Sequence, residues 1–335
     1  MLAAIVLRRS LMTIVTLFGV AIVVFLLLRV APGDPIAMMI SPGAGPDDVA
    51  ALRARYGLDA PPLIQFWIWL HGILMGDFGT SISLRLDVLS LLAERLPATL
   101  ELSGLALALG VFLGGAIAVI ATLLRRSFVA GLIDAVNGLL LAVPDFVWAL
   151  AFVLVLGVLI PVLPLSGRID PALETTFVTR FYLVENLVSG RLALAGDILR
   201  HMAMPSLALA LPLAAVIARI LKEALAEAMQ QDYVLLARVK GFSELRLVLG
   251  EALRNAVGPT LALTGVQFTF LIGGTVIVER IFSYPGIGNM AIDAVINRDL
   301  PLIQGLVLVF GLMFLVVNLV IDLAVVALNP KLRHG

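Results

Sequence analysis

The chain has 335 residues, of which 61% are hydrophobic and 14% are charged, and its formal net charge is zero. Soluble domains are about 45–50% apolar and about 25% charged, so this much apolar surface indicates a protein whose solvent is lipid. The balanced charge argues against a nucleic-acid partner. The chain has no cysteine, which excludes disulfides, zinc–thiolate sites and cysteine nucleophiles.

The first apolar run lies at residues 10–28, which is long enough to span a membrane, since a span needs about 20 residues. We therefore assign residues 1–31 to the N-terminus and a first transmembrane helix. Arg8 and Arg9 precede the run, as in a signal peptide. However, the run exceeds the usual apolar core of such peptides, and Val30-Ala31-Pro32 is a poor cleavage site, so an uncleaved span is expected.

Residues 32–98 are more polar, and we predict a periplasmic loop region for them. The sequence Pro-Gly-Asp-Pro at 32–35 favours a turn where the chain leaves the membrane. Asp47 and Asp48 can cap a short helix. Trp67 and Trp69 lie in a segment, 65–74, that is typical of an interfacial helix.

Residues 99–335 are predicted to form the membrane-embedded core. Five further spans are expected, at 99–124, 133–160, 204–221, 259–278 and 302–328. An outer loop at 161–203 and a second outer segment at 283–301, which contains a short helix, separate some of them. Six spans place both termini on the same side. Lys and Arg cluster at residues 8–9, 125–126, 222–254 and 331–333, and six spans put all four clusters on that same side. Because loops rich in Lys and Arg stay in the cytoplasm, we expect that side to be cytoplasmic.

Asp145 lies in the middle of the third predicted span, beside Pro144, which is expected to kink the helix. A carboxylate at this depth costs about 2.5–3.5 kcal/mol on insertion scales, so it should face the bundle interior or an aqueous path. It can line such a path and meet an ammonium group there, pair with another helix, or lie nearer the surface. Asp322 and Asn318 form an i, i+4 pair that is typical of a helix–helix contact.

The segment 222–258 is polar and interrupts the apolar runs. Residues 222–240 contain no Pro or Gly, so we expect the fourth span to continue as one helix into the cytoplasm. Gly241 should end it in a left-handed conformation. Ser243 should cap a second helix at 244–253, and residues 255–259 should turn the chain back into the membrane.

Three interpretations of this segment remain open on physical grounds. It can be a solvated loop, a helix on the lipid surface, or an amphipathic helix that enters a groove of another protein. The mixture of acidic and basic side chains argues against the lipid surface, where a wide basic face is favoured.

The residues of this segment resemble the cytoplasmic coupling loop of binding-protein-dependent ABC importer permeases. The resemblance rests on Asp-Tyr-Val at 232–234, Ala-Arg-Val-Lys-Gly at 237–241, Ala-Leu-Arg-Asn-Ala at 252–256 and Pro259. Similar matches to the dipeptide/oligopeptide/nickel permease family occur at 29–35, 56–59, 76–81, 95–102, 282–288 and 298–305. The outer loop, which ends at 201–205, looks most like the first membrane subunit of the dipeptide permease branch.

The resemblance implies an all-α polytopic membrane protein with six transmembrane helices, similar to type I ABC importer permeases. It also implies a set of residues that couple this chain to an ATPase. These are Glu223, Ala224, Asp232, Ala237, Lys240, Gly241, Phe242, Ser243, Glu244, Leu245 and Arg254. Lys240 and Arg254 can pair with carboxylates of the ATPase or can simply be solvated. For Asp232, a structural ion pair with Arg238 is expected.

The implied partners are two ATP-binding subunits on the cytoplasmic side, a paralogous second permease subunit, a periplasmic binding protein and the lipid bilayer. The implied cargo is a short peptide, with a dipeptide favoured over nickel, glutathione and longer peptides. The sequence contains no GxxxxGK[ST] phosphate loop, so ATP and Mg²⁺ are expected on the partner subunits, with no cofactor or metal on this chain. His71, His201 and His334 are scattered and predict no metal site.

The expected location is the bacterial inner membrane, with several passes and both termini in the cytoplasm. An ion-coupled secondary transporter would call for paired carboxylates within the membrane and repeated halves. An intramembrane enzyme would call for clustered catalytic side chains at membrane depth. The sequence supplies neither pattern, so we expect a transport subunit that is not itself an enzyme.

Overall fold

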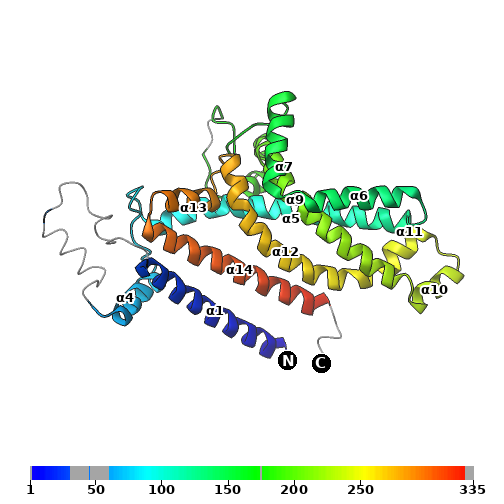
Figure 1. Cartoon of the computed structure of the whole chain (residues 1–335), viewed down its shortest axis with the longest axis horizontal. Coiled ribbons are helices and arrows are strands. Elements are labelled where there is room, and N and C mark those ends of the chain that lie inside the picture. The colour runs from blue at the N-terminus through cyan, green and yellow to red at the C-terminus, as the bar shows by residue number, and fades with distance from the viewer. Residues whose placement is uncertain (1, 31–44, 46–59, 174–175, 329–335) are drawn as a thin grey trace. The chain divides into compact units, whose positions relative to one another are not determined.

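The computed structural model describes residues 2–30, 45, 60–173 and 176–328 (Figure 1). Within these ranges the chain is helical, apart from turns and one isolated antiparallel bridge between Thr80 and Asp87. The all-α class is therefore confirmed for the described part of the chain. The predicted turn at 32–35 and the helix cap at Asp47 and Asp48 lie outside the described residues.

The helices follow one another along the whole described chain. In order they are α1 (Leu2–Val30), α4 (Pro62–Leu74), α5 (Val88–Leu123), α6 (Phe128–Ala142), α7 (Asp145–Phe152), the π-helix η1 (Val153–Leu159), α8 (Tyr182–Val188), α9 (Leu192–Ala228), α10 (Asp232–Val239), α11 (Glu244–Arg246), the π-helix η2 (Leu247–Ala252), α12 (Leu253–Ile281), α13 (Ile287–Ile296) and α14 (Leu300–Leu328).

Several of these helices are long and apolar enough to cross a membrane. Among the described residues, three qualify alone, at Val88–Leu123, Leu192–Ala228 and Leu300–Ile321. Two bent pairs, Phe128–Ala142 with Asp145–Leu159 and Glu244–Gly258 with Leu263–Ile281, raise the number to as many as five. A shorter apolar stretch, Leu11–Leu26, lies in α1, where the sequence predicts the first span.

Two helices begin well before the spans that hydropathy predicts. The α5 helix starts at Val88 rather than near 99, and α9 starts at Leu192 rather than near 204. Pro97 lies inside α5, while Pro205 and Pro212 lie inside α9, without ending either helix. Hydropathy detects the apolar part of a helix and not its polar extension, so parts of the predicted outer loops are helical.

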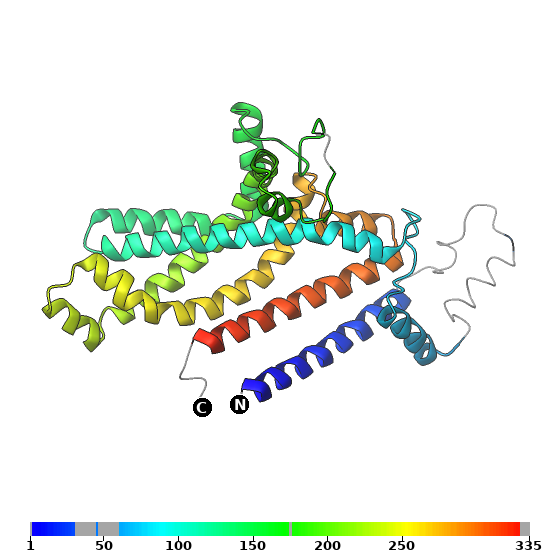
Figure 2. The same ribbon diagram turned by 180° about the vertical axis from the view of Figure 1, so that it is seen from behind.

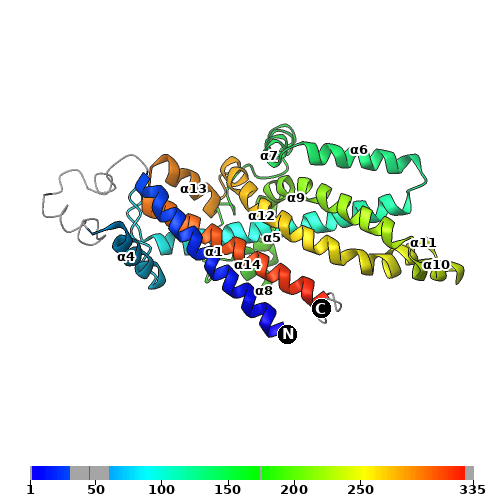
Figure 3. The same cartoon turned by 60° about the horizontal axis from the view of Figure 1, so that its bottom comes forward.

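The third predicted span is not one kinked helix. The α6 helix ends at Ala142, α7 begins at Asp145, and the two axes differ by 98° (Figure 3). Val143, with φ −92° and ψ 120°, is extended, as expected for the residue before a proline. Pro144 is also extended and precedes the first turn of α7, where its missing N–H carries no cost.

The chain divides into two compact units. The larger contains residues 97–289 and 317–335 with the first two residues, and the smaller contains 3–96 and 290–316. In the larger unit α9 is central, since it packs against α6, α7, α8 and α12. Gly114 of α5 lies so close to Ala214 and Ile217 of α9 that a Cβ atom has no room there. Such small residues allow transmembrane helices to approach closely.

In the smaller unit, aromatic rings join α1 to α4. Phe25 lies 5.2 Å from Phe66 and 5.8 Å from Trp69, measured between ring centroids. Phe18 lies 5.8 Å from Phe66 and 6.3 Å from Trp67. The helix that the two tryptophans predict is present as α4, and its rings pack against α1.

Asp299 organises the turn that precedes α5 within the same unit. Its Oδ2 atom accepts hydrogen bonds from Ser81 Oγ at 2.6 Å, Ser83 N at 2.9 Å and Ser83 Oγ at 2.7 Å. Burial by itself raises the pKa of Asp299, but these hydrogen bonds outweigh it and hold the pKa below its ordinary value. The carboxylate therefore stabilises the 81–83 turn in its ionised form.

Candidate functional site

The polar segment folds as a helical hairpin, which we call the α10–η2 hairpin (residues 229–256). The predicted single helix at 222–240 is wrong, because α9 ends at Ala228 and α10 begins at Asp232. Gln230 N donates to Glu227 O at 3.1 Å and Gln231 N donates to Ala228 O at 3.2 Å, which forms a tight turn. In Figure 2 the hairpin lies at the C-terminal end of α9, where the ribbon is yellow-green to yellow.

Gly241 ends α10 in the predicted left-handed conformation, with φ +83°. Gly241 N donates to Arg238 O at 3.0 Å, and Phe242 N donates to Ala237 O at 3.3 Å. This pair of bonds is a Schellman motif, which satisfies carbonyls that the helix end leaves free. Ser243 caps the next helix as predicted, since its side chain accepts a hydrogen bond from Arg246 N at 3.4 Å.

The predicted turn at 255–259 is absent. The helix that starts at Glu244 passes through η2 and continues as α12 to Ile281, and its axis bends by 63° between Glu244–Gly258 and Leu263–Ile281. Backbone N–H groups in a helix are satisfied internally, so the chain re-enters its apolar part without exposing them. The hairpin and α12 are therefore one continuous helical path.

A hydrophobic core joins the hairpin to α9. Val234 and Ala237 of α10 and Leu247 and Val248 of η2 are buried against Leu225 and its neighbours on α9. The Tyr233 hydroxyl and Asn255 Nδ2 lie 2.8 Å apart, which joins α10 to α12. A solvated loop does not bury apolar side chains in this way, so that interpretation is excluded for this segment.

Other apolar side chains of the hairpin remain uncovered in the isolated chain. The exposed fractions are 57% for Leu236, 86% for Val239, 53% for Leu245 and 47% for Leu249. The charged residues Lys240, Glu244 and Arg246, which neighbour them in the sequence, are also exposed, and the guanidinium of Arg246 lies 4.0 Å from the centre of the Phe242 ring. An exposed apolar surface with a charged margin is typical of a protein-docking surface.

The predicted coupling residues differ in burial. Ala237 is buried in the hairpin core, and Ala224 and Phe242 are half-buried. The exposed members are Glu223, Asp232, Lys240, Gly241, Ser243, Glu244, Leu245 and Arg254. The predicted ion pair between Asp232 and Arg238 is wrong, because Arg238 Nε lies 3.2 Å from Glu244 Oε1 across the Gly241 turn. Asp232 instead occupies the first turn of α10, where the helix dipole favours an acidic residue.

Asp145 is the first residue of α7 and is half-buried. It lies on the wall of a cavity of about 280 Å³, which Pro144, Leu213, Gln267 and Phe270 also line. Its Oδ1 atom accepts a hydrogen bond from Phe146 N at 2.7 Å. At the bend between α6 and α7 a carboxylate thus lies beside a cavity.

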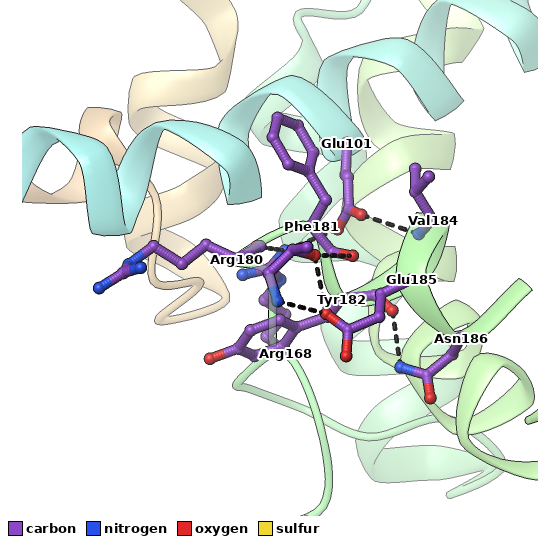
Figure 4. Close-up of polar contacts among 9 residues, drawn as sticks. Glu101, Arg168, Arg180, Phe181, Tyr182, Val184, Glu185 and Asn186 are labelled. Carbon is purple, nitrogen blue, oxygen red and sulfur yellow. Dashed lines mark hydrogen bonds and ion pairs between the residues drawn. The ribbon is translucent and has the colours of Figure 1, made fainter. Parts of the chain in front are cut away.

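A buried ion pair, which the sequence analysis did not identify, connects α5 to the segment before α8 (Figure 4). Arg168 Nη2 lies 2.6 Å from Glu101 Oε2 and donates to Arg180 O at 2.9 Å. The guanidinium also lies 3.9 Å from the centre of the Tyr182 ring. Glu101 Oε1 accepts a hydrogen bond from Val184 N at 3.1 Å. A carboxylate near the start of the predicted span at 99–124 was the signal in the sequence, but nothing there indicated its partner.

The same segment is ordered by Glu185 of α8 (Figure 4). Its carboxylate accepts hydrogen bonds from Val178 N at 3.0 Å and from Thr179 N at 2.6 Å and Oγ1 at 2.7 Å. The hydrogen bonds from Val178 and Thr179 lower the pKa of Glu185. Asn186 Nδ2 donates to Tyr182 O at 2.7 Å within the helix. Residues 178–186 thus form a compact element rather than an open loop.

A second buried carboxylate, Glu279, lies near the end of α12. Thr99 Oγ1 donates to Glu279 Oε1 at 2.6 Å, and Asn289 N donates to Glu279 Oε2 at 2.9 Å. Gly286 approaches the carboxyl group so closely that a side chain at this position has no room. Burial raises the pKa of nearby Tyr284, so its hydroxyl stays protonated. These contacts fix the turn from α12 to α13.

Among residues 60–173 and 176–328, where most described side chains lie, no group of His, Cys, Asp or Glu could hold a metal ion. The side chain of Asp322 is outside the described residues, so the helix–helix contact predicted for Asp322 and Asn318 stays a prediction.

Comparisons with known proteins agree over nearly the whole chain. Residues 106–334 match the family model for the binding-protein-dependent transport system inner membrane component, and residues 1–103 match the model for the N-terminal part of such components. The di/tripeptide transport system permease protein DppB of Pseudomonas aeruginosa is 36% identical over 328 residues, which are 98% of each chain. The glutathione transport system permease protein GsiC of Salmonella typhimurium is 35% identical over 331 residues, again 98% of each chain.

The dipeptide transport system permease protein DppB of Escherichia coli is 33% identical over 337 residues, which cover 98% of each chain. Among solved structures, an inward-facing form of the MetNI methionine ABC transporter matches with a TM-score of 0.56 at 13% identity. The match covers 71% of this chain and 96% of that one. At this identity the structural match supports the fold alone.

Proposed function

The chain belongs to the family of binding-protein-dependent transport system inner membrane components, and we propose that its α10–η2 hairpin docks onto an ATP-hydrolysing subunit. The chain is a permease subunit of an ABC importer and is not itself catalytic. The observation that carries the docking proposal is the hairpin itself, which has a packed core and uncovered apolar side chains at Leu236, Val239, Leu245 and Leu249.

The continuity of the helices supports a mechanical role for the hairpin. It connects to α9 through the turn at 229–231 and to α12 without a break. A displacement of Leu245 by a partner would therefore move both helices rather than a loop. ATP-driven closure of the partner subunits would in this way change the access of the pathway from one side of the membrane to the other, by rigid-body movement.

The cargo that we propose is a short peptide, with a dipeptide favoured. Relatives of nearly equal similarity carry the names of dipeptide, di/tripeptide and glutathione permeases. Glutathione is itself a peptide, so a small peptide with free charged ends is the description that these names share. Nickel and longer oligopeptides are the alternatives that an uptake assay would separate.

The assembly that we propose contains this chain, a paralogous permease subunit, two ATP-binding subunits that hold ATP and Mg²⁺, and a periplasmic binding protein. We place the chain in the bacterial inner membrane with six spans, α1 contributing the first. The basic clusters near residues 8–9, 125–126 and 331–333 support an orientation with both termini and the hairpin in the cytoplasm.

Because the chain has no cysteine, single cysteines can test the docking surface. Leu245→Cys and Leu249→Cys should cross-link to the ATP-binding subunit in the assembled transporter, and ATP should change the yield. Val178→Cys is the matched control, since this side chain is 90% exposed and lies far along the chain from the hairpin. Equal cross-linking at all three positions, or none to an ATP-binding protein, would overturn the proposal.

Uptake into proteoliposomes tests the transport class. Dipeptide import should require ATP and the binding protein. Import that continues without ATP on an ion gradient would instead identify a secondary transporter.

A further inference from the structure

The cavity beside Asp145 is a binding site candidate that differs from the docking surface. Pro144 and Asp145 at the start of α7, Pro212 and Leu213 of α9, and Gln267 and Phe270 of α12 line it. Of the ten residues on its wall, Asp145 and Gln267 alone carry polar side chains. Apolar walls with a few polar groups are typical of ligand sites.

The Asp145 carboxylate packs against Gly274 of α12, which has no side chain to fill that space. Gly274 of α12 faces the Oδ2 atom of Asp145 so closely that any side chain at 274 would displace the carboxylate. A Cβ atom added at Gly274 would also lie 3.4 Å from a methyl carbon of Leu209 on α9. The carboxylate is thus held by the packing of α7 against α9 and α12.

The sign of the charge in this cavity follows from Asp145. The carbonyl end of α6 and the amide end of α7 meet here, and their partial charges of about half a unit have opposite signs and roughly offset one another. The Phe146 N–H bonds to only one carboxylate oxygen, Oδ1. The ionised carboxylate therefore leaves a net negative charge on the wall, which favours a cationic group.

The cavity is open at the surface of the chain. Phe270 on its rim is 70% exposed, and Asp145 is half-buried rather than enclosed. Its volume of about 280 Å³ lies near the lower limit of ligand pockets, which is roughly 300 Å³. It can therefore hold one end of a small molecule rather than an entire oligopeptide.

Broken transmembrane helices commonly mark the place where a transporter binds its cargo, because free backbone groups and charged side chains are tolerated there. On this basis we propose that Asp145, with Gln267, forms a subsite that binds the primary ammonium group of the cargo during translocation. This inference rests on the proposed function, and it specifies the chemical class of the ligand as a free α-ammonium group.

The test uses the complete transporter in proteoliposomes, with labelled dialanine as the probe. Asp145→Asn removes the charge but keeps the size of the side chain. ATP-dependent uptake should fall by about 10-fold to 100-fold, the range expected for loss of one charge-assisted hydrogen bond.

A second variant restores the charge from the opposite wall. In Asp145→Asn/Gln267→Glu the negative charge returns to the same cavity, so uptake of dialanine should recover substantially. Uptake at the wild-type rate in Asp145→Asn would overturn the subsite while leaving the proposed function intact. Absence of ATP-dependent uptake in the wild-type complex would instead overturn the proposed function itself.

A chemical probe reports on the cavity without transport. With Gln267→Cys as the single cysteine of the complex, a cationic ethylammonium thiosulfonate should react several-fold faster than its anionic ethylsulfonate analogue. Asp145→Asn should abolish this preference. If neither reagent reacts and Asp145→Asn impairs subunit assembly, Asp145 pairs with a cation of a neighbouring helix and the subsite proposal fails.

Discussion

Replacing Arg168 with alanine should release residues 178–184 from α5. The Arg168 and Glu101 side chains are 4% and 3% exposed, so the variant leaves Glu101 buried without its countercharge. Removing one partner from a buried ion pair costs about 3–5 kcal/mol. The variant also loses the hydrogen bond to Arg180 O and the contact with the Tyr182 ring.

This cost should appear as faster local opening of the segment. The Val184 N–H donates to Glu101 Oε1, so its hydrogen exchange measures whether the segment stays attached to α5. At about 1.4 kcal/mol per factor of ten, the expected cost corresponds to a 100-fold or greater increase in exchange for the peptide that contains Val184. Hydrogen exchange with mass spectrometry on the assembled transporter supplies the measurement.

Arg180→Ala is the matched control. Arg180 contributes its backbone carbonyl and not its side chain, which is exposed, so exchange at Val184 should be unchanged (Figure 4). If Arg168→Ala exchanges no faster than Arg180→Ala, the ion pair does not anchor the segment and the reasoning is refuted.

Two further predictions concern Gly241 and Asp299. Gly241→Pro should leave membrane insertion intact but uncouple ATP hydrolysis from uptake. The reason is that proline fixes φ near −65°, whereas the turn needs φ +83°. Normal uptake in this variant would contradict the proposed role of the hairpin. The pKa of Asp299 is lowered in the folded chain, so its ionised carboxylate stabilises the fold. This stabilisation is complete above the unfolded pKa of about 3.9 and is lost as the pH falls through the lower folded pKa. Proteolysis of the 81–83 turn should therefore increase in strong acid, and Asp299→Asn should remove that dependence; a pH-independent wild type would show that the carboxylate is not needed.

Hydropathy was sufficient to predict the helical class and the approximate positions of the long spans, because a helix that crosses a membrane must be apolar along its length. It misplaced the starts of α5 and α9, since helices continue beyond the apolar region into polar sequence. It also missed the 98° bend after Ala142, because one proline can kink a helix or end it, and the surrounding packing decides which outcome occurs.

In the hairpin, features that depend on a few neighbouring residues were predicted correctly. Gly241 ends a helix because glycine tolerates positive φ, and Ser243 caps one because its hydroxyl reaches the next backbone N–H groups. Features that depend on distant contacts were predicted incorrectly. The turn at 229–231 folds α10 back, so that Val234 and Ala237 pack against Leu225 of α9.

The sequence by itself therefore determined the solvent of the protein, its family and the local stops and caps of its polar hairpin, because these follow from composition and from residues within one or two turns. Tertiary structure alone decided that Glu101 meets Arg168, that Glu279 meets Thr99 and that Asp145 lies on an open cavity. These pairings join residues far apart in the chain. Their energies depend on burial and distance, and linear order specifies neither.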